Sequence, residues 1–195
     1  MMTFSLAVKE YALKIAMIHK TEISGGFLSS LSLAFLKSFY LALIESPSGF
    51  CIVAKEDSEI VGFVSGTTHL NAFYAYFLSR YFLQSFFILL PKLFSSLKRI
   101  IETLRYPKKE DSLPKAELLT IAMVSTFQGK GIGGLMPQPF ISEMKKRNIT
   151  VFKVVVGESL PNAIAFYEKN GFEFLKNITI HAKALSRVYA YTIKA

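Results

Sequence analysis

Cysteine is almost absent from the sequence, since Cys51 is the single one among 195 residues. One thiol excludes an intramolecular disulfide framework and a zinc site built from several thiolates. Cys51 lies in an apolar run, residues 50–54, which favours a buried, unreactive thiol over a nucleophile. The three histidines, His19, His69 and His181, lack the spacing of metal ligands, so we predict no metal site and assign them no function.

Long hydrophobic runs are also lacking. No stretch reaches the roughly 18 uninterrupted apolar residues that a membrane-spanning helix needs. The nearest, residues 71–90, is interrupted by Arg80 and diluted by polar residues. At the N-terminus, Lys9 and Glu10 come before any signal-like apolar stretch develops. We therefore expect a cytoplasmic protein.

Acidic residues are scarce: Asp and Glu number 14 against 23 Lys and Arg, which gives a net charge of +9. A basic surplus favours anionic partners, among them nucleic acid, phospholipid headgroups and phosphorylated cofactors, without choosing between them. The basic residues are dispersed, and no RNA- or DNA-binding module motif occurs. We therefore expect no nucleic-acid partner.

Hydrophobic residues, in contrast, make up 51% of the chain, and the mean hydropathy is +0.36. This composition supports a large core and excludes a disordered chain, which needs low hydrophobicity and many charges. The length suits one domain, which we predict to extend over residues 1–195.

Hydrophobic patterning predicts an alternation of strands and helices. Strands are expected at residues 4–8, 49–54, 60–68, 117–124, 151–156, 172–180 and 187–193. Helices are expected at 11–19, at 27–44, over a long aromatic stretch at 70–105, up to Arg147 after a glycine-rich turn, and from Pro161 to Gly171.

The glycine-rich turn, Gln128-Gly129-Lys130-Gly131-Ile132-Gly133-Gly134, lies between a predicted strand and a predicted helix. Glycines allow positive φ and the close approach of a ligand, and N–H groups at the start of a helix favour a phosphate. The turn therefore either binds a phosphate group or is a plain tight turn. The chain has no Gly-Lys-Ser/Thr, which excludes a Walker-type loop.

The dinucleotide-binding pattern is a second alternative for this turn. Gly129, Gly131 and Gly134 satisfy G-x-G-x-x-G, and Glu158 follows the next predicted strand as a ribose-binding acid would. However, four residues separate Val124 from the first glycine, whereas a dinucleotide fold turns directly off its strand.

Two blocks together resemble the GNAT superfamily of acyl-CoA-dependent N-acyltransferases. The first, residues 128–133, is similar to the family motif Arg/Gln-x-x-Gly-x-Gly/Ala. The second, residues 163–172, is similar to the helix N-x-x-A-x-x-L/F-Y-x-x-x-G-F and its exit. Leu160 stands where the family has asparagine, which Asn162 could replace from two residues further on.

The resemblance implies a fold of class α/β (α+β) with three layers. Its sheet is mixed and mostly antiparallel, and its fourth and fifth strands, here 117–124 and 151–156, run parallel and splay apart to admit pantetheine. The aromatic stretch at 70–105 would be a helical insertion. Pro137 and Pro139 fall about a turn into the helix after the glycines, so this helix is either kinked or restarts at Pro139.

The resemblance also implies acetyl-CoA as the acyl donor. Main-chain groups near Met123 and Val124 would pair with pantetheine, N–H groups of the glycine turn would hold the pyrophosphate, and Phe166 would line the exit helix. The residues assigned to acetyl-CoA binding are Met123, Val124, Gln128, Gly129, Lys130, Gly131, Ile132, Gly133, Gly134, Asn162 and Phe166.

Two residues are candidates for acid–base chemistry by the same resemblance. Tyr167 would be the general acid near the CoA sulfur; its alternative is a helix tyrosine that only packs. Glu117 would be the general base. Its alternative is a solvated residue at the start of a strand, in which case a water chain or another carboxylate would serve as the base. A backbone N–H near Met123 would stabilise the oxyanion.

The predicted function is acetyl transfer from acetyl-CoA to a primary amine of a small molecule, an amino sugar being one candidate. The alternative is a non-catalytic CoA-binding or membrane-peripheral interaction protein. The stretch 70–105 has three interpretations: extra core or a homodimer interface, a lid over the acceptor, or peripheral membrane contact through its aromatic and basic residues.

Overall fold

The structure, a computed structural model, describes residues 1–23, 25, 28–89, 112–179 and 185–194, with the backbone alone over 82–89. Its strands are β1 Thr3–Leu6, β2 Gly49–Glu56, β3 Glu59–Thr67, β4 Glu117–Met123, β5 Val151–Gly157, β6 Glu173–Thr179 and β7 Leu185–Thr192. Its α-helices are α1 Ala12–Glu22, α2 Leu33–Glu45, α3 Leu70–Leu89, α5 Pro137–Lys146 and α6 Pro161–Lys169.

The seven strands form one mixed sheet in the order β1-β2-β3-β4-β5-β7-β6. Within the described residues β4 and β5 are the one parallel pair, and all other neighbours are antiparallel. The mixed, mostly antiparallel sheet with a parallel fourth and fifth strand is therefore confirmed.

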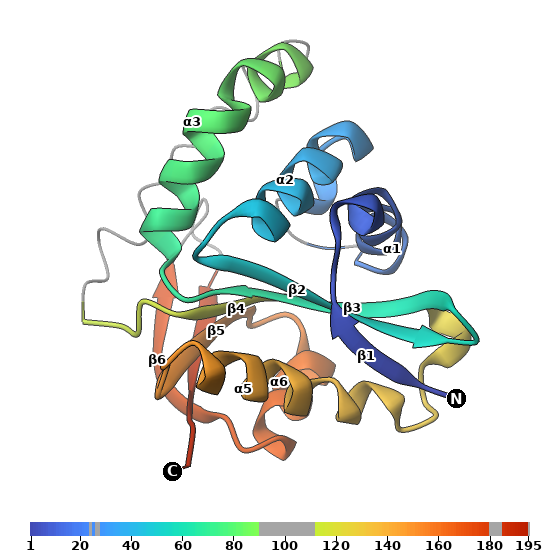
Figure 1. Cartoon of the computed structure of the whole chain (residues 1–195). Helices are drawn as coiled ribbons and strands as arrows, with labels where there is room; N and C mark the ends of the chain where they lie inside the picture. Colours follow the sequence, from blue (N-terminus) through green and yellow to red (C-terminus); the bar gives the residue numbers. More distant parts are fainter. Residues whose placement is uncertain (24, 26–27, 90–111, 180–184, 195) are drawn as a thin grey trace.

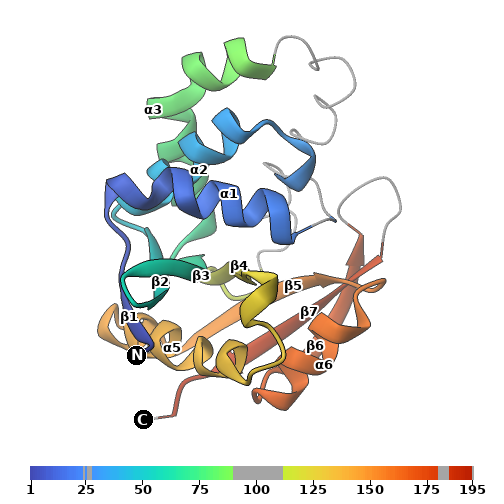
Figure 2. The same ribbon diagram turned by 90° about the vertical axis from the view of Figure 1, so that its right-hand side faces the viewer.

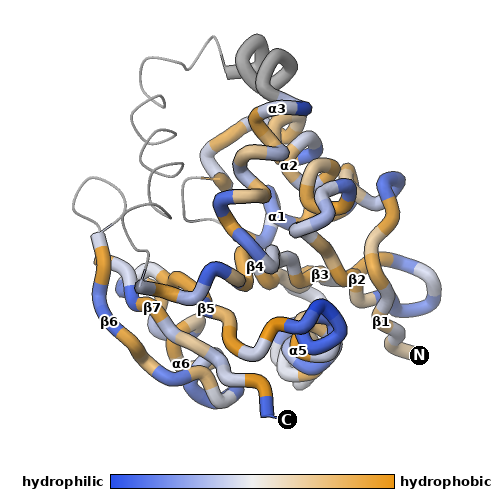
Figure 3. Tube along the Cα trace, turned by 60° about the vertical axis from the view of Figure 1, so that its left-hand side comes forward, coloured by the Kyte–Doolittle hydropathy of each residue, from blue (hydrophilic) through white to orange (hydrophobic). Residues whose placement is uncertain are grey.

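Helices cover both faces of the sheet, which gives three layers. Helices α1, α2 and α3 lie on one face, and α5 and α6 lie on the other (Figure 1; Figure 2). One buried cluster joins α1, α2 and α3 to β2 and β3, and a second joins α5 and α6 to β4, β5 and β7. Hydrophobic residues accordingly gather along the central strands and on α2 and α3 (Figure 3).

Helix α2 begins later than the sequence pattern predicts. The Ser32 side chain accepts a hydrogen bond from Phe35 N–H at 3.2 Å and caps the helix, so α2 starts at Leu33. Residues Leu28–Ser30 form a short 3₁₀ turn instead. The predicted helix start at residue 27 is therefore wrong, and residue 27 itself lies outside the described part.

The helix after the glycine turn is interrupted rather than continuous. A 3₁₀ turn over Ile132–Leu135 comes first, and α5 then starts at Pro137. Both prolines fall in the first helical turn, where N–H groups have no partner within the helix, so neither breaks α5. The alternative of a restart at Pro139 is wrong by two residues.

The predicted helix over 70–105 is described as far as Leu89, where α3 ends in the described residues; 90–105 lie outside them. Of the described helices, none is both long and apolar enough to cross a bilayer. Strand β1 spans Thr3–Leu6 and begins and ends earlier than residues 4–8, and β7 begins at Leu185, two residues before the predicted start.

Candidate active site

The parallel pair opens where the strands leave each other. Only Glu117 with Lys153 and Leu118 with Val154 are paired between β4 and β5. Beyond them β4 stays paired with β3 up to Met123, while β5 follows β7 to Gly157. A pocket of about 840 Å³ lies here, lined by the β4 residues from Leu119 to Met123, by Val155, Val156 and Gly157 of β5, and by residues of the surrounding helices. The predicted splay of the two strands is therefore confirmed.

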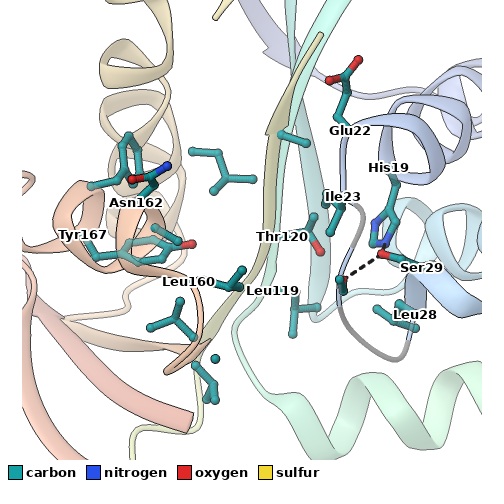
Figure 4. A pocket seen from close by; sticks show the side chains of 18 of the residues that line it. His19, Glu22, Ile23, Leu28, Ser29, Leu119, Thr120, Leu160, Asn162 and Tyr167 are labelled. Carbon is teal, nitrogen blue, oxygen red and sulfur yellow. Dashed lines mark hydrogen bonds between the residues drawn. The ribbon is translucent and has the colours of Figure 1, made fainter. Parts of the chain in front are cut away.

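The pocket is lined from both faces of the sheet (Figure 4). On one side, α1 and the following segment bring His19, Glu22 and Ser29 to its wall; on the other, α6 brings Tyr167. Strand β4 runs between the two groups and carries Thr120 (Figure 4). Two reactants could thus approach β4 from opposite sides.

Glu117 is buried at the closed end of the splay. Its carboxylate lies 3.0 Å from Lys153 Nζ, and both side chains are less than a tenth exposed. Burial raises the pKa of Glu117, and the charge of Lys153 opposes the rise. The alternative that Glu117 is a solvated strand-start residue is wrong, because the residue is 7% exposed.

Tyr167 lies on α6 with its ring buried and its hydroxyl group directed toward β4 (Figure 4). Its ring packs edge-on against Phe166 and Phe172, with centroids 5.4 and 5.2 Å away. Burial raises the pKa of the phenol, so Tyr167 is protonated at neutral pH and able to donate a proton.

The glycine turn has a backbone that fits a phosphate group. Gly129 and Gly131 have φ of 73° and 78°, which side-chain-bearing residues rarely adopt. A Cβ added at Gly129, Gly131 or Gly133 would meet nothing within 4 Å, so the surface above these residues is open. The Gly134 N–H donates to Gly131 O at 3.1 Å and is engaged within the turn.

Gln128 ties this turn to the end of β4. Its Nε2 donates to Met123 O at 2.7 Å and lies 3.4 Å from a Glu22 carboxylate oxygen. Val124 N–H donates to Val61 O at 2.8 Å, so it is engaged with β3. Lys130 is exposed and lies over the Phe127 ring, 5.3 Å from its centroid.

The pocket brings together part of the predicted site. The predicted residues that line it are Glu117, Met123, Gln128, Gly133, Asn162, Phe166 and Tyr167. Those that do not line it are Val124, Gly129, Lys130, Gly131, Ile132 and Gly134. Most of the second group belong to the turn, which therefore adjoins the pocket through Gln128 and Gly133 without lying inside it.

Three titratable residues that line the pocket were not predicted as site residues: His19, Glu22 and Tyr74. His19 was assigned no function, yet it is 3% exposed and hydrogen-bonded on both ring nitrogens. The one signal in the sequence was a histidine on the same face of this helix as Ala12, Ile15 and Ala16, which are apolar. In the described segments, no three His, Cys, Asp or Glu residues lie close enough to hold a metal ion.

The sheet is mixed, its parallel pair opens, and a pocket and a glycine turn lie at the opening. These features fit the class that the two sequence blocks predict, which is the acyl-CoA-dependent acyltransferases. The family model described as the acetyltransferase (GNAT) family matches residues 22–172. The chain therefore belongs to the GNAT family of acetyltransferases. A comparison with curated proteins finds no match.

Solved structures share the fold at low sequence identity. The ribosomal-protein-S18-alanine N-acetyltransferase from Escherichia coli is 16% identical, with a TM-score of 0.64, and the match covers 100% of this chain and 96% of that one. The PaiA N-acetyltransferase from Thermoplasma acidophilum, solved in complex with coenzyme A, is 15% identical, with a TM-score of 0.62 and coverage of 98% and 99%. YncA from Salmonella typhimurium, solved with acetyl-CoA, is 13% identical, with a TM-score of 0.58 and coverage of 100% and 95%.

Proposed function

We propose that the chain transfers the acetyl group of acetyl-CoA to a primary amine of a small molecule. The observation that carries this proposal is the pocket at the β4–β5 opening, which is lined on one side by Tyr167 and on the other by His19 and Glu22. One side suits the donor and the other the acceptor, with β4 between them.

The donor would bind on the α6 side of β4. Its pyrophosphate would lie on the backbone of the glycine turn, where Gly129 and Gly131 have positive φ and an added Cβ would meet nothing within 4 Å. Its pantetheine arm would pass between β4 and β5, past Met123, Asn162 and Phe166. Acetyl-CoA supplies the thioester, an activated acetyl group.

Two residues of the chain would move protons. Glu117 would take a proton from the nitrogen as that atom forms its bond to the acetyl carbon, and a raised pKa makes its carboxylate a stronger base. Tyr167 would give a proton to the departing sulfur, and the raised pKa of its phenol keeps that proton available. A backbone N–H near Met123 would stabilise the oxyanion.

The charge of the pocket supports a cationic acceptor. Among the described residues that line it, the charged ones are Glu22 and Glu117, both acidic, although the whole chain carries +9. An ammonium group is the complementary charge. Apolar side chains such as Leu28, Phe39 and Leu119 line the same pocket, so the body of the amine would contact hydrophobic surface. Amino sugars remain one candidate class.

Calorimetric titration with acetyl-CoA tests the donor first, with desulfo-CoA and NADH as comparison ligands. Binding of both CoA species without NADH is expected. Phenethylamine, n-hexylamine and glucosamine are then tested as acceptors by following the release of free CoA thiol. Binding of acetyl-CoA without turnover of any amine would support the non-catalytic alternative, and failure of all CoA species to bind would refute the proposal.

The remaining expectations stay predictions: one domain over residues 1–195, a cytoplasmic location, a homodimer, and peripheral membrane contact through residues 70–105. Gel filtration with light scattering would test the homodimer. Sedimentation with anionic vesicles would test the membrane contact.

A further inference from the structure

Helix α3 brings to the pocket one residue that the proposed chemistry does not use. The helix lies between β3 and β4 in the chain, and its residue Tyr74 is half-buried and lines the pocket. In space α3 lies with α2 on the face of the sheet opposite α6 (Figure 1; Figure 2). Tyr74 is therefore on the side of β4 that the proposed function gives to the acceptor.

The first half of α3 is fixed to the elements around it. The Leu70 N–H donates to Lys115 O at 3.0 Å, which ties the start of α3 to the segment before β4. The buried Phe73 ring packs edge-on against Phe39 of α2, with the two centroids 5.3 Å apart. Because Tyr74 follows Phe73 directly, it cannot leave the pocket unless these contacts break, so it is a fixed part of the pocket wall.

Tyr74 forms an uncharged surface together with one residue from each of the two diverging strands. These residues are Leu119 of β4 and Val155 of β5, and both line the pocket. We call Tyr74, Leu119 and Val155 the α3 wall. All three side chains pack against the same buried cluster, which consists of Leu70, Leu113, Ile178 and Val188. Since a packed cluster supports it from behind, the α3 wall cannot easily give way to make room for a ligand.

A bulge in β4 turns Leu119 toward this wall. The residues of β4 that pair with β3 pass directly from Thr120 to Leu118, so Leu119 is an extra residue in the ladder. Such a bulge bends the strand and changes the direction of nearby side chains. Leu119 packs on the α3 side, and Figure 4 shows Thr120 on the side of His19, so two consecutive residues of β4 face the acceptor side. The α3 wall therefore adjoins the middle of β4, where the two reactants would meet.

The charge next to the α3 wall is that of Glu117, the proposed base. Glu117 also lines the pocket and comes two residues before Leu119 on β4. Burial raises the pKa of Tyr74, and the nearby charge of Glu117 raises it further, so the phenol is neutral. An amine whose nitrogen lies within reach of Glu117 would thus hold the rest of its structure beside the Tyr74 ring.

We propose that Tyr74 determines which amines are acetylated, and this role rests on the proposed function. The Tyr74 ring contacts the apolar body of the amine and limits the size of that body. The preferred acceptors are primary amines with a compact apolar body, such as phenethylamine or n-hexylamine. A second fused ring, or a chain two carbons longer, would collide with the α3 wall.

The test measures kcat/KM for two pairs of amines whose members differ in size. The pairs are phenethylamine with 2-(1-naphthyl)ethylamine, and n-hexylamine with n-octylamine. Tyr74→Ala removes the ring, Tyr74→Leu shortens the side chain, and Tyr74→Phe keeps the ring. Tyr76→Ala is the matched control, because Tyr76 is also a half-buried tyrosine of α3 but is not among the residues that line the pocket.

The wild type should favour the smaller amine of each pair. Tyr74→Ala should shift the ratio of kcat/KM toward the larger amine about tenfold or more, since a hydrophobic pocket discriminates by at least this factor for a single methylene group. Its KM for the smaller amine should rise, because a contact is lost, while its KM for acetyl-CoA should stay unchanged, because the donor would bind on the other side of β4. Tyr74→Leu should shift the ratio less, and Tyr74→Phe and Tyr76→Ala should keep the wild-type ratio.

Thermal unfolding identifies a variant that does not fold, and Tyr74→Leu is decisive if Tyr74→Ala fails to fold. A wild-type ratio in the decisive variant would overturn this role of Tyr74 and leave the proposed function intact. So would an equal shift in Tyr76→Ala, which would assign the effect to the packing of α3 as a whole. A wild type that prefers the larger amines, or that acetylates glucosamine alone, would have the same consequence. A wild type that acetylates no amine would refute the proposed function, and the role of Tyr74 with it.

Discussion

Lys153 Nζ lies 3.0 Å from a carboxylate oxygen of Glu117, and these two residues form the first of the two pairs that join β4 to β5. The ion pair therefore lies at the closed end of the splay, beyond which the strands separate. Lys153 Nζ also donates to Pro114 O at 2.5 Å, so the segment before β4 helps to hold the lysine side chain in place. The charge that stabilises Glu117 thus comes from the same strand pair that shapes the pocket.

Lys153→Met should destabilise the fold more at pH 8 than at pH 5. The pKa of Glu117 is already raised above its ordinary 4.5, so the native state binds the proton more tightly than the unfolded state. The stability that this group contributes is therefore fully present below pH 4.5 and is lost as the pH rises from 4.5 through the raised native pKa. Without Lys153 the pKa rises further, and the cost at pH 8 should be about 3–5 kcal/mol.

Urea unfolding at the two pH values measures this difference. Glu117→Gln combined with Lys153→Met removes the buried charge and should recover most of the loss at pH 8. Lys146→Met removes an exposed lysine from α5 and should change stability little at either pH. A penalty that does not depend on pH would show that Glu117 ionisation is not its cause.

Tyr167→Phe should lower kcat about a hundredfold and leave acetyl-CoA affinity unchanged, because it removes a proton donor and keeps the ring. Tyr191→Phe is the matched control: its ring packs on Phe172 as that of Tyr167 does, with centroids 5.2 Å apart in both pairs, but it does not line the pocket. The kcat and KM of Tyr167→Phe and Tyr191→Phe, measured by steady-state kinetics below pH 9, make the comparison. Undiminished activity in Tyr167→Phe would exclude the general-acid role.

Gly131→Ala should weaken acetyl-CoA binding about fivefold or more, since a Cβ in the left-handed region costs about 1–2 kcal/mol and the turn would change conformation. Gly171→Ala imposes the same conformational cost at φ 82°, after α6, and should lower stability without changing affinity. Calorimetry and thermal unfolding of both variants make the comparison. Equal affinities in the two variants would show that the turn does not hold the donor.

Gly66→Ala should destabilise the fold by about 1–3 kcal/mol, because an added Cβ would lie 2.6 Å from the Phe140 ring and 2.7 Å from Glu117 O. Gly66 pairs with Leu118 in β4, so relief of the clash would displace the start of that strand. Gly157→Ala, where the nearest contact is 3.7 Å, should be nearly neutral. Chemical denaturation measures both, and similar values would contradict the packing argument.

The parts of the site that could be predicted are those encoded in short stretches of sequence. The glycine turn and the helix that carries Tyr167 are each contiguous, so their residue types alone indicate their conformation. Boundaries were less certain where one side chain decides them. Ser32 caps α2, which begins six residues after the predicted start. The two prolines enter the first turn of α5 because no N–H is needed there.

The sequence by itself determined the order of strands and helices, the glycine turn, the Tyr167 helix and, through these, the family. Only the tertiary structure decided that Glu117 faces Lys153 and that His19 lies between Tyr40 and Ser29. Local patterns follow from backbone preferences within a few residues. Contacts between residues far apart in the chain form when helices and strands pack, and packing also sets the burial that shifts their pKa values.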